Sequence, residues 1–122
     1  MNIKSLEARM KPSVYGVGYL GCNLGLKASY NGKKCPIYYA WVRMLERCYS
    51  KKLHERFPSY IGCEVSDYFK NFSNFYEWCQ NQTGFNCDDY ELDKDLLIKG
   101  NKLYSEYTCV FIPKFLNSLL LT

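Results

Sequence analysis

The residues best suited to chemistry are cations that cluster between positions 43 and 56. Arg43 and Arg47 are four residues apart, which places both on one face of a helix, with Tyr39 one turn earlier. Such cations bind phosphates, and neighbouring aromatic rings can stack on bases. The sequence predicts a surface for nucleic acid or another partner here, against the alternative of an ordinary solvated surface. The predicted binding residues are Arg43, Arg47, Lys51, Lys52 and Arg56.

Charge is distributed unevenly along the chain. Residues 1–60 contain 11 Lys and Arg against 3 Asp and Glu, a balance of +8. Residues 61–122 contain 5 against 9, a balance of −4, so the two halves sum to the net charge of +4. This asymmetry favours a basic face that meets an anion, and nucleic acid is the usual candidate.

The cysteines and the histidine indicate less chemistry. There are 7 cysteines, an odd number, and no two of them form a C-x-x-C pair. A zinc site drawn from distant cysteines stays open, although His54 is the only histidine and lacks a ligand-spaced partner. We expect reduced, buried cysteines that act as small apolar side chains, and a surface position for His54.

Length and composition predict one folded domain over residues 1–122. The hydrophobic fraction is 48% and the aromatic fraction 17%, enough for a core in a chain of this size. Neither a membrane-spanning run nor the apolar core of a signal peptide is expected, so we predict a cytoplasmic protein with no membrane partner.

Residues 1–12 are expected to form a polar arm. Residues 13–35 are expected to form a β-hairpin, with strands over 14–20 and 24–30 before the turn dipeptide Asn31-Gly32.

The rest of the chain predicts a helical part over residues 36–82 and a strand–turn–strand–helix unit over 90–121, hence an α+β fold. A helix should begin at Pro36, a basic loop should cover 50–58, a short extended piece 60–65, and Ser66 should cap a second helix with an aromatic stripe. Strands are expected over 91–98 and 107–112, separated by the turn Gly100-Asn101. The predicted core residues are Trp41, Leu45, Phe72, Phe75 and Phe111.

The C-terminal string LDKDLLIKGNKLYSEYTCVFIPKFLN resembles small bacteriophage proteins related to the HNH (His-Me finger) endonucleases. In that family an LD-(R/K)-x-D strand is followed by a GN turn, YSPENC, an aromatic strand and a helix that ends in Asn or His. Upstream, Tyr39 to Tyr49 resembles the family's YxxWxxMLxRCY helix, and the stretch from Tyr60 to Trp78 resembles its connector, YxGCxV followed by spaced aromatics. The resemblance covers residues 36–120 and implies a ββα metal-dependent nuclease unit.

The resemblance also implies that the catalytic positions are altered. Lys94 stands where the general-base histidine of the family lies, after the acidic position Asp93, and Thr108 replaces the Asn that orients it. Asn101 matches the Asn of the GN turn, and Asn117 matches the terminal helix position. The catalytic candidates are therefore Asp93, Lys94, Asn101 and Asn117, and the candidate ligands for a divalent metal such as Mg²⁺ are Asp93, Asp95 and Asn117.

The alternative for these residues is structural. Asp93 and Asp95 are then solvent-facing or turn-capping, and Asn101 lies in its turn because Asn tolerates a left-handed backbone.

Three functions stay open. The first is a phage-encoded nucleic-acid-binding protein with a degenerate, inactive HNH-like unit and no required cofactor. The second is a phage inhibitor that binds a host or anti-phage defence protein, since tyrosines also suit protein interfaces. The third is an active metal-dependent endonuclease, which Lys94 and Thr108 argue against.

Overall fold

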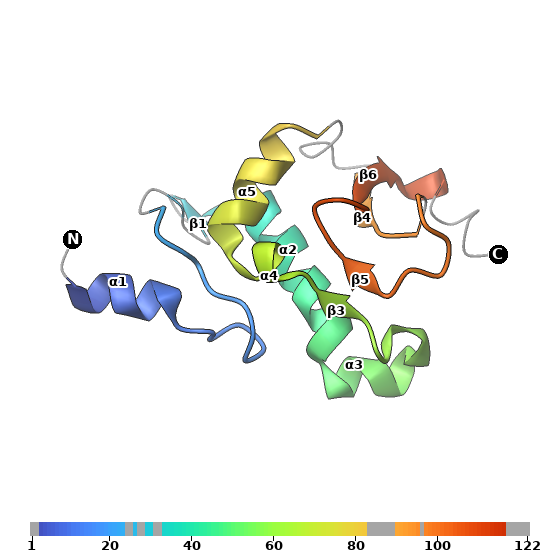
Figure 1. Ribbon diagram of the computed structural model, residues 1–122, viewed down its shortest axis with the longest axis horizontal. Helices are drawn as coiled ribbons and strands as arrows, with labels where there is room; N and C mark the ends of the chain where they lie inside the picture. The colour runs from blue at the N-terminus through green and yellow to red at the C-terminus, as the bar shows by residue number, and fades with distance from the viewer. Residues whose placement is uncertain are drawn as a thin grey trace.

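The computed structural model has an α+β architecture in which helices pack together with small two-stranded sheets (Figure 1). Figure 1 places α1, Ile3–Met10, and the β4–β6 pair toward opposite ends of the longest axis. In the part of the chain that is described, no helix has the length and apolar character needed to cross a bilayer. The structure describes residues 3–23, 26, 29–30, 33–82, 90–95 and 97–116.

Two helices form the centre of the molecule. Helix α2, Pro36–Tyr49, begins with proline at its first turn as predicted, and its apolar residues at helical spacing lie on one buried face. Helix α5, Phe72–Gln80, packs against that face, where the ring centroids of Trp41 and Phe72 are 5.2 Å apart. The indole N–H of Trp41 donates to the carbonyl of Phe69 at 2.7 Å, so the buried donor is satisfied.

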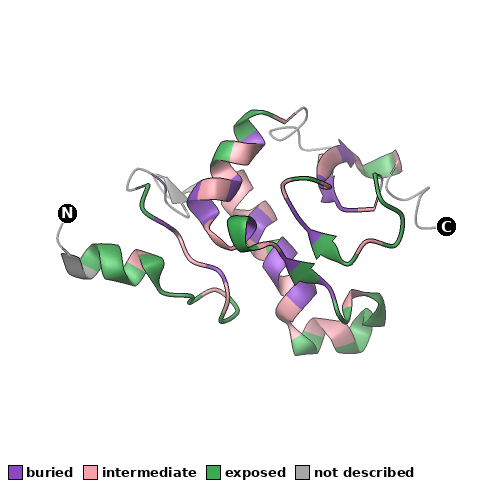
Figure 2. Ribbon diagram, in the orientation of Figure 1, coloured by how far each residue is buried: buried purple, intermediate pink, exposed green. Residues whose placement is uncertain are grey.

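The aromatic stripe is core, as predicted. Figure 2 shows buried residues along α2 and α5, and α4 contributes the buried Phe69. Helix α4, Asp67–Lys70, is capped by the Ser66 hydroxyl, which accepts from the Phe69 N–H at 3.2 Å. Asn71 then breaks the helix and caps α5. Fully buried side chains include Trp41, Leu45, Phe69, Phe72 and Phe75, whereas Phe111 is only half-buried, so its assignment to the core was too strong.

The strand expected over residues 14–20 is wrong. Val14 to Gly18 instead form a tight turn, in which the N–H groups of Val17 and Gly18 both donate to the Val14 carbonyl. Tyr15 and Gly16 have φ of +53° and +73°, a backbone that no strand contains. Glycine is needed at 18 for close packing, because a Cβ there would lie 2.5 Å from Leu45 and 2.8 Å from Trp41.

The N-terminal hairpin is small and does not include the expected strand over 14–20, because residues 29–30 pair with residues 33–34 instead. Strands β1, Ser29–Tyr30, and β2, Lys33–Lys34, pair antiparallel. The predicted turn Asn31-Gly32, and most of the expected strand over 24–30, lie outside the described residues. The predicted polar arm contains α1, which Arg9 ties to the following chain through its guanidinium bonds to the carbonyls of Gly21 and Asn23.

The basic stretch over residues 50–58 is helical rather than a loop. Ser50 caps helix α3, Lys51–Arg56, by accepting from the Leu53 N–H at 3.2 Å. A 3-10 turn, η1, covers Pro58–Tyr60. No residue of α3 is buried, and its sequence KKLHER has no apolar residues at helical spacing. Because apolar periodicity is the main sequence signal for a helix, this stretch resembles a polar loop.

The C-terminal strands pair antiparallel, as predicted, but both are shorter. Strand β4, Tyr90–Asp93, pairs with β6, Val110–Pro113, in the register Glu91 with Ile112. A helix follows at residues 114–116. Strand β3, Glu64–Val65, lies within the predicted extended piece and pairs in parallel with β5, Leu103–Tyr104, a pairing that the sequence did not suggest.

Candidate nucleic-acid interface

Lys94 directly follows β4, and its ammonium is held on two sides. Its Nζ lies 2.9 Å and 3.1 Å from the two carboxylate oxygens of Asp95. The same Nζ lies 5.6 Å from the ring centroid of Tyr104, within cation–π range. The Lys94 side chain is only 10% exposed. A buried cation with its own counterion therefore occupies the end of the first strand of this unit.

The two carboxylates beside Lys94 differ in exposure. The Asp95 side chain, which pairs with Lys94, is 40% exposed. Asp93 is buried, and its Oδ2 accepts from the Asp95 N–H at 3.0 Å, which caps the turn after β4. The turn-capping role is thus confirmed for Asp93, while a solvent-facing position is wrong for it. Among the described residues, no three His, Cys, Asp or Glu side chains gather in a way that could hold a metal ion. Asn117 lies outside the described residues.

Asn101 closes the loop between β4 and β6. Its side-chain amide donates to the carbonyls of Lys94 (3.2 Å) and Leu103 (2.7 Å) and to the hydroxyl of Thr108 (3.2 Å). Its Oδ1 accepts from the Leu103 N–H at 3.0 Å. The left-handed backbone in this turn belongs to Gly100, with φ of +75°, so the reason proposed for Asn101 was wrong. Asn101 is present for its side-chain hydrogen bonds.

Arg47 reaches from α2 toward the same unit. Burial alone would lower the pKa of Arg47, but the Tyr104 and Tyr60 hydroxyls and the Glu91 carboxylate nearby raise the pKa overall. Burial also raises the pKa of Tyr104. The neighbouring Arg47, which is hydrogen-bonded to the Tyr104 hydroxyl, opposes that rise. Tyr104 therefore contacts both Arg47 and Lys94 and connects α2 to the β4–β6 unit.

A hollow of about 220 Å³ opens between α2, α3 and η1. Two arginines and two aromatic rings line it, and we call it the basic hollow: Arg43, Arg47, Phe57 and Tyr60. The Arg47 guanidinium lies 6.0 Å from the Tyr60 ring centroid. Glu46 also lines the hollow, and its carboxylate accepts from the Tyr15 hydroxyl at 2.9 Å, which occupies one of its oxygens.

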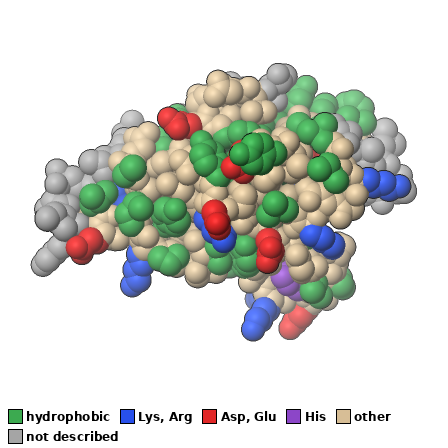
Figure 3. Space-filling view, in the orientation of Figure 1, with side chains coloured by type: hydrophobic (Ala, Val, Ile, Leu, Met, Phe, Trp, Pro, Cys, Tyr) green, Lys and Arg blue, Asp and Glu red, His purple; other side chains and the backbone are tan. Residues whose placement is uncertain are grey.

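The three remaining predicted cations, Lys51, Lys52 and Arg56, are exposed on α3 beside this hollow. Arg56 stands 5.6 Å over the Phe57 ring, and Phe57 itself is 46% exposed. Figure 3 shows one face of the molecule, on which basic side chains are interspersed with acidic and apolar ones. The five predicted cations thus lie together on α2 and α3, and we call this region the basic corner. Arg47 is more buried than expected.

His54 has a structural contact. Its Nε2 lies 2.7 Å from the Arg47 carbonyl, and because a carbonyl only accepts, the Nε2–H must donate. This bond fastens α3 to α2. The expected surface position is correct only in part, since the ring is half-buried.

The described cysteines are free, and all except Cys22 are buried, as predicted; Cys87 lies outside the described residues. Burial raises the pKa of Cys48 and of Cys109 to about 12, with neighbouring thiols or carboxylates adding to the effect. Such thiols stay protonated near neutral pH and are poor nucleophiles and poor metal ligands.

Sequence reasoning missed Tyr60 and Tyr104, which position the predicted arginine and lysine. Both tyrosines belong to the motifs that carry the resemblance, but those motifs gave them no role, because their roles depend on contacts between distant segments. Comparison with models of known families, with curated proteins and with solved structures found no match.

Proposed function

We propose that this chain is a phage-encoded nucleic-acid-binding protein, built on a degenerate HNH-like unit that binds without cutting. The observation that carries the proposal is the basic hollow, in which Arg43 and Arg47 lie beside Phe57 and Tyr60. Guanidinium groups suit phosphate oxygens, and flat rings suit stacked bases. The exposed cations of α3 extend this surface on its solvent side.

The surroundings of Lys94 support binding without catalysis. Phosphodiester hydrolysis requires a group that takes a proton from water and a metal that stabilises the leaving oxygen. At the position implied for the base, Lys94 is an ammonium paired with Asp95 and offers no lone pair. Thr108, which replaces the Asn that would orient the base, is itself hydrogen-bonded to Asn101 and Ser105.

Binding is tested by fluorescence anisotropy with labelled duplex and single-stranded DNA. We expect Arg43→Glu to weaken binding at least about tenfold, because it reverses a phosphate-binding charge. Lys99→Glu makes the same change in net charge at an exposed position outside the hollow, and should alter affinity less than about twofold. Equal losses in the two variants would show that net charge, rather than this surface, drives binding.

Catalysis is tested separately with supercoiled plasmid. The proposal expects no nicking above background with Mg²⁺ or Mn²⁺. Metal-dependent nicking that disappears in Asp93→Asn would show a working nuclease and refute the inactive assignment.

The inhibitor function stays a second candidate because of exposed apolar side chains elsewhere on the molecule. Tyr107 is 84% exposed and Phe115 70% exposed, and neither belongs to the basic hollow. Affinity capture from host lysate, with and without nuclease treatment, separates the two functions. Loss of captured protein after nuclease treatment supports nucleic-acid binding, and a stoichiometric partner that survives it supports the inhibitor.

A further inference from the structure

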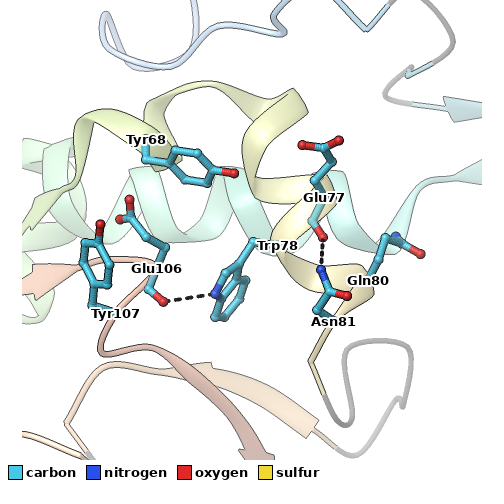
Figure 4. Close-up of a pocket in the computed structure, with 7 residues that line it drawn as sticks. All are labelled: Tyr68, Glu77, Trp78, Gln80, Asn81, Glu106 and Tyr107. Carbon is cyan, nitrogen blue, oxygen red and sulfur yellow. Dashed lines mark hydrogen bonds between the residues drawn. The ribbon is translucent and has the colours of Figure 1, made fainter.

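A second hollow, of about 640 Å³, lies on a different part of the molecule (Figure 4). Its walls come from α4, from α5 and from the turn between β5 and β6. Aromatic and acidic side chains dominate the lining, and no described Lys or Arg contributes to it. We call it the aromatic–acidic pocket and define it by Tyr68, Glu77, Trp78, Glu106 and Tyr107.

An unpaired acceptor lies in this pocket. The Oε1 of Glu106 is buried and has no hydrogen-bond partner among the residues that the structure describes. A buried carboxylate oxygen without a donor is costly, and nearly all such atoms in folded proteins are paired. Figure 4 shows the Glu106 carboxylate beside the rings of Tyr107 and Tyr68, with the Trp78 indole on the side of the Glu106 backbone carbonyl. A ligand that donates hydrogen bonds and carries positive charge would pair with the carboxylate of Glu106, which lines the pocket.

The Trp78 wall of the pocket is held in place before any ligand binds. The Trp78 indole N–H donates to the Glu106 carbonyl at 3.2 Å, and the Trp78 ring packs 5.0 Å from that of Phe69. The turn that presents Glu106 and Tyr107 is closed by the Ser105 hydroxyl, which accepts from the Tyr107 N–H at 3.3 Å. The Tyr107 ring is 84% exposed, so its face is accessible to a ligand.

We propose that this pocket binds the guanidinium of an arginine side chain presented by a protein partner. Fixed aromatic faces attract cations, and a carboxylate beside them pairs with the guanidinium fork. Glu106 and Glu77 repel phosphate, which argues against a nucleic acid at this surface. The pocket volume of about 640 Å³ and its aromatic walls suit an organic cation better than a metal ion, which requires several converging oxygens. The pocket therefore constitutes a protein-binding site independent of the basic hollow.

The proposal is tested by NMR titration with Nα-acetyl-arginine amide, which carries one guanidinium and no other charge. The two tryptophans supply a matched pair of indole N–H resonances. We expect a saturable shift of the Trp78 resonance, while that of Trp41, which is fully buried, stays fixed. The uncharged isostere Nα-acetyl-citrulline amide should produce no saturable shift.

Two variants assign the interaction. Glu106→Gln keeps the side-chain shape and removes the charge, so binding should weaken at least about tenfold. Tyr107→Ala removes an exposed ring and should weaken binding several-fold without unfolding the protein. Glu55→Gln, on α3 and outside the pocket, serves as the charge-matched control and should bind like the wild type.

Three results would overturn the proposal: an absence of any saturable Trp78 shift, equal shifts with the citrulline probe, or undiminished binding by Glu106→Gln. Equally tight binding of Nα-acetyl-lysine amide would overturn the assignment to guanidinium. None of these results depends on whether the protein binds DNA, so the two proposals fail separately.

Discussion

At the scale of single residues, side chains that the HNH resemblance marks for catalysis perform structural work. Lys94 pairs with Asp95 and lies against Tyr104, Asp93 caps a turn, and Asn101 connects three parts of one loop. Each interaction stabilises the chain between β4 and β6. The unit therefore keeps its geometry through bonds among its own residues.

Replacing Asn101 with Ala tests this structural role. The change removes the donors to Lys94, Leu103 and Thr108 and the acceptor for the Leu103 N–H. We expect the free energy of unfolding to fall by about 1–3 kcal/mol, measured by urea denaturation. Asn74→Ala is the control, because the Asn74 side chain makes one exposed bond among the described residues, to the Tyr68 carbonyl, and its loss should cost less. Equal costs for the two variants would contradict the role assigned to Asn101.

At the scale of elements, the molecule depends on the contact between α2 and α5. Trp41 and Leu45 from α2 meet Phe72 and Phe75 from α5, and all four side chains are fully buried. The turn at Gly18 closes over the same contact from the N-terminal side. Helix α3 has no such buried face and depends on its Ser50 cap and on the His54 bond to α2.

Phe72→Ala should cost about 3–5 kcal/mol of stability, because it leaves a cavity between α2 and α5. Phe115→Ala makes the same chemical change at a side chain that is 70% exposed, and should cost less than about 0.5 kcal/mol. Thermal and urea unfolding of the pair provide the measurement. A Phe72 variant as stable as the Phe115 variant would contradict the assigned core.

At the scale of the whole molecule, several weak acids are kept neutral by burial. Burial raises the pKa of Cys48 and Cys109 to about 12, and it raises the pKa of Cys79 and Tyr104 further. In the unfolded chain a thiol loses its proton near pH 8.5. Between these values only the unfolded state releases protons, so rising pH favours unfolding.

We therefore expect the stabilisation that depends on these protonated thiols to be fully present below about pH 8. The free energy of unfolding should then fall as the pH rises through 9 and 10. Each buried thiol should contribute up to about 1.4 kcal/mol per pH unit in that range. Urea unfolding in the presence of reductant, from neutral pH upward, measures the slope. Cys79→Ala should make the slope shallower, and a stability that does not change with pH would contradict the burial of these thiols.

The sequence predicted the elements whose signals are local. Helix α2 was predicted because Pro36 precedes apolar residues at helical spacing, and α4 because Ser66 is a good cap. Prediction from the sequence failed where the local structure depends on contacts between segments that are distant in the chain. The glycine-rich stretch over 14–20 suggested a strand, yet Gly18 is required by the side chains of α2, and the two-residue pairing of β3 with β5 has no local signal. For the same reason the basic corner was predictable, whereas the unpaired Glu106 oxygen was not.

The most direct test of the central proposal is the salt dependence of DNA binding, compared between the wild type and a Lys51→Gln/Lys52→Gln variant. Each phosphate contact on duplex DNA contributes about −0.9 to the slope of log K against log salt concentration. Because both lysines are exposed on α3, we expect the slope of the variant to be shallower by roughly 1.8, with Lys99→Gln unchanged from the wild type. Wild-type binding that does not weaken with salt, or a slope that the double substitution leaves unaltered, would contradict a nucleic-acid interface on this surface.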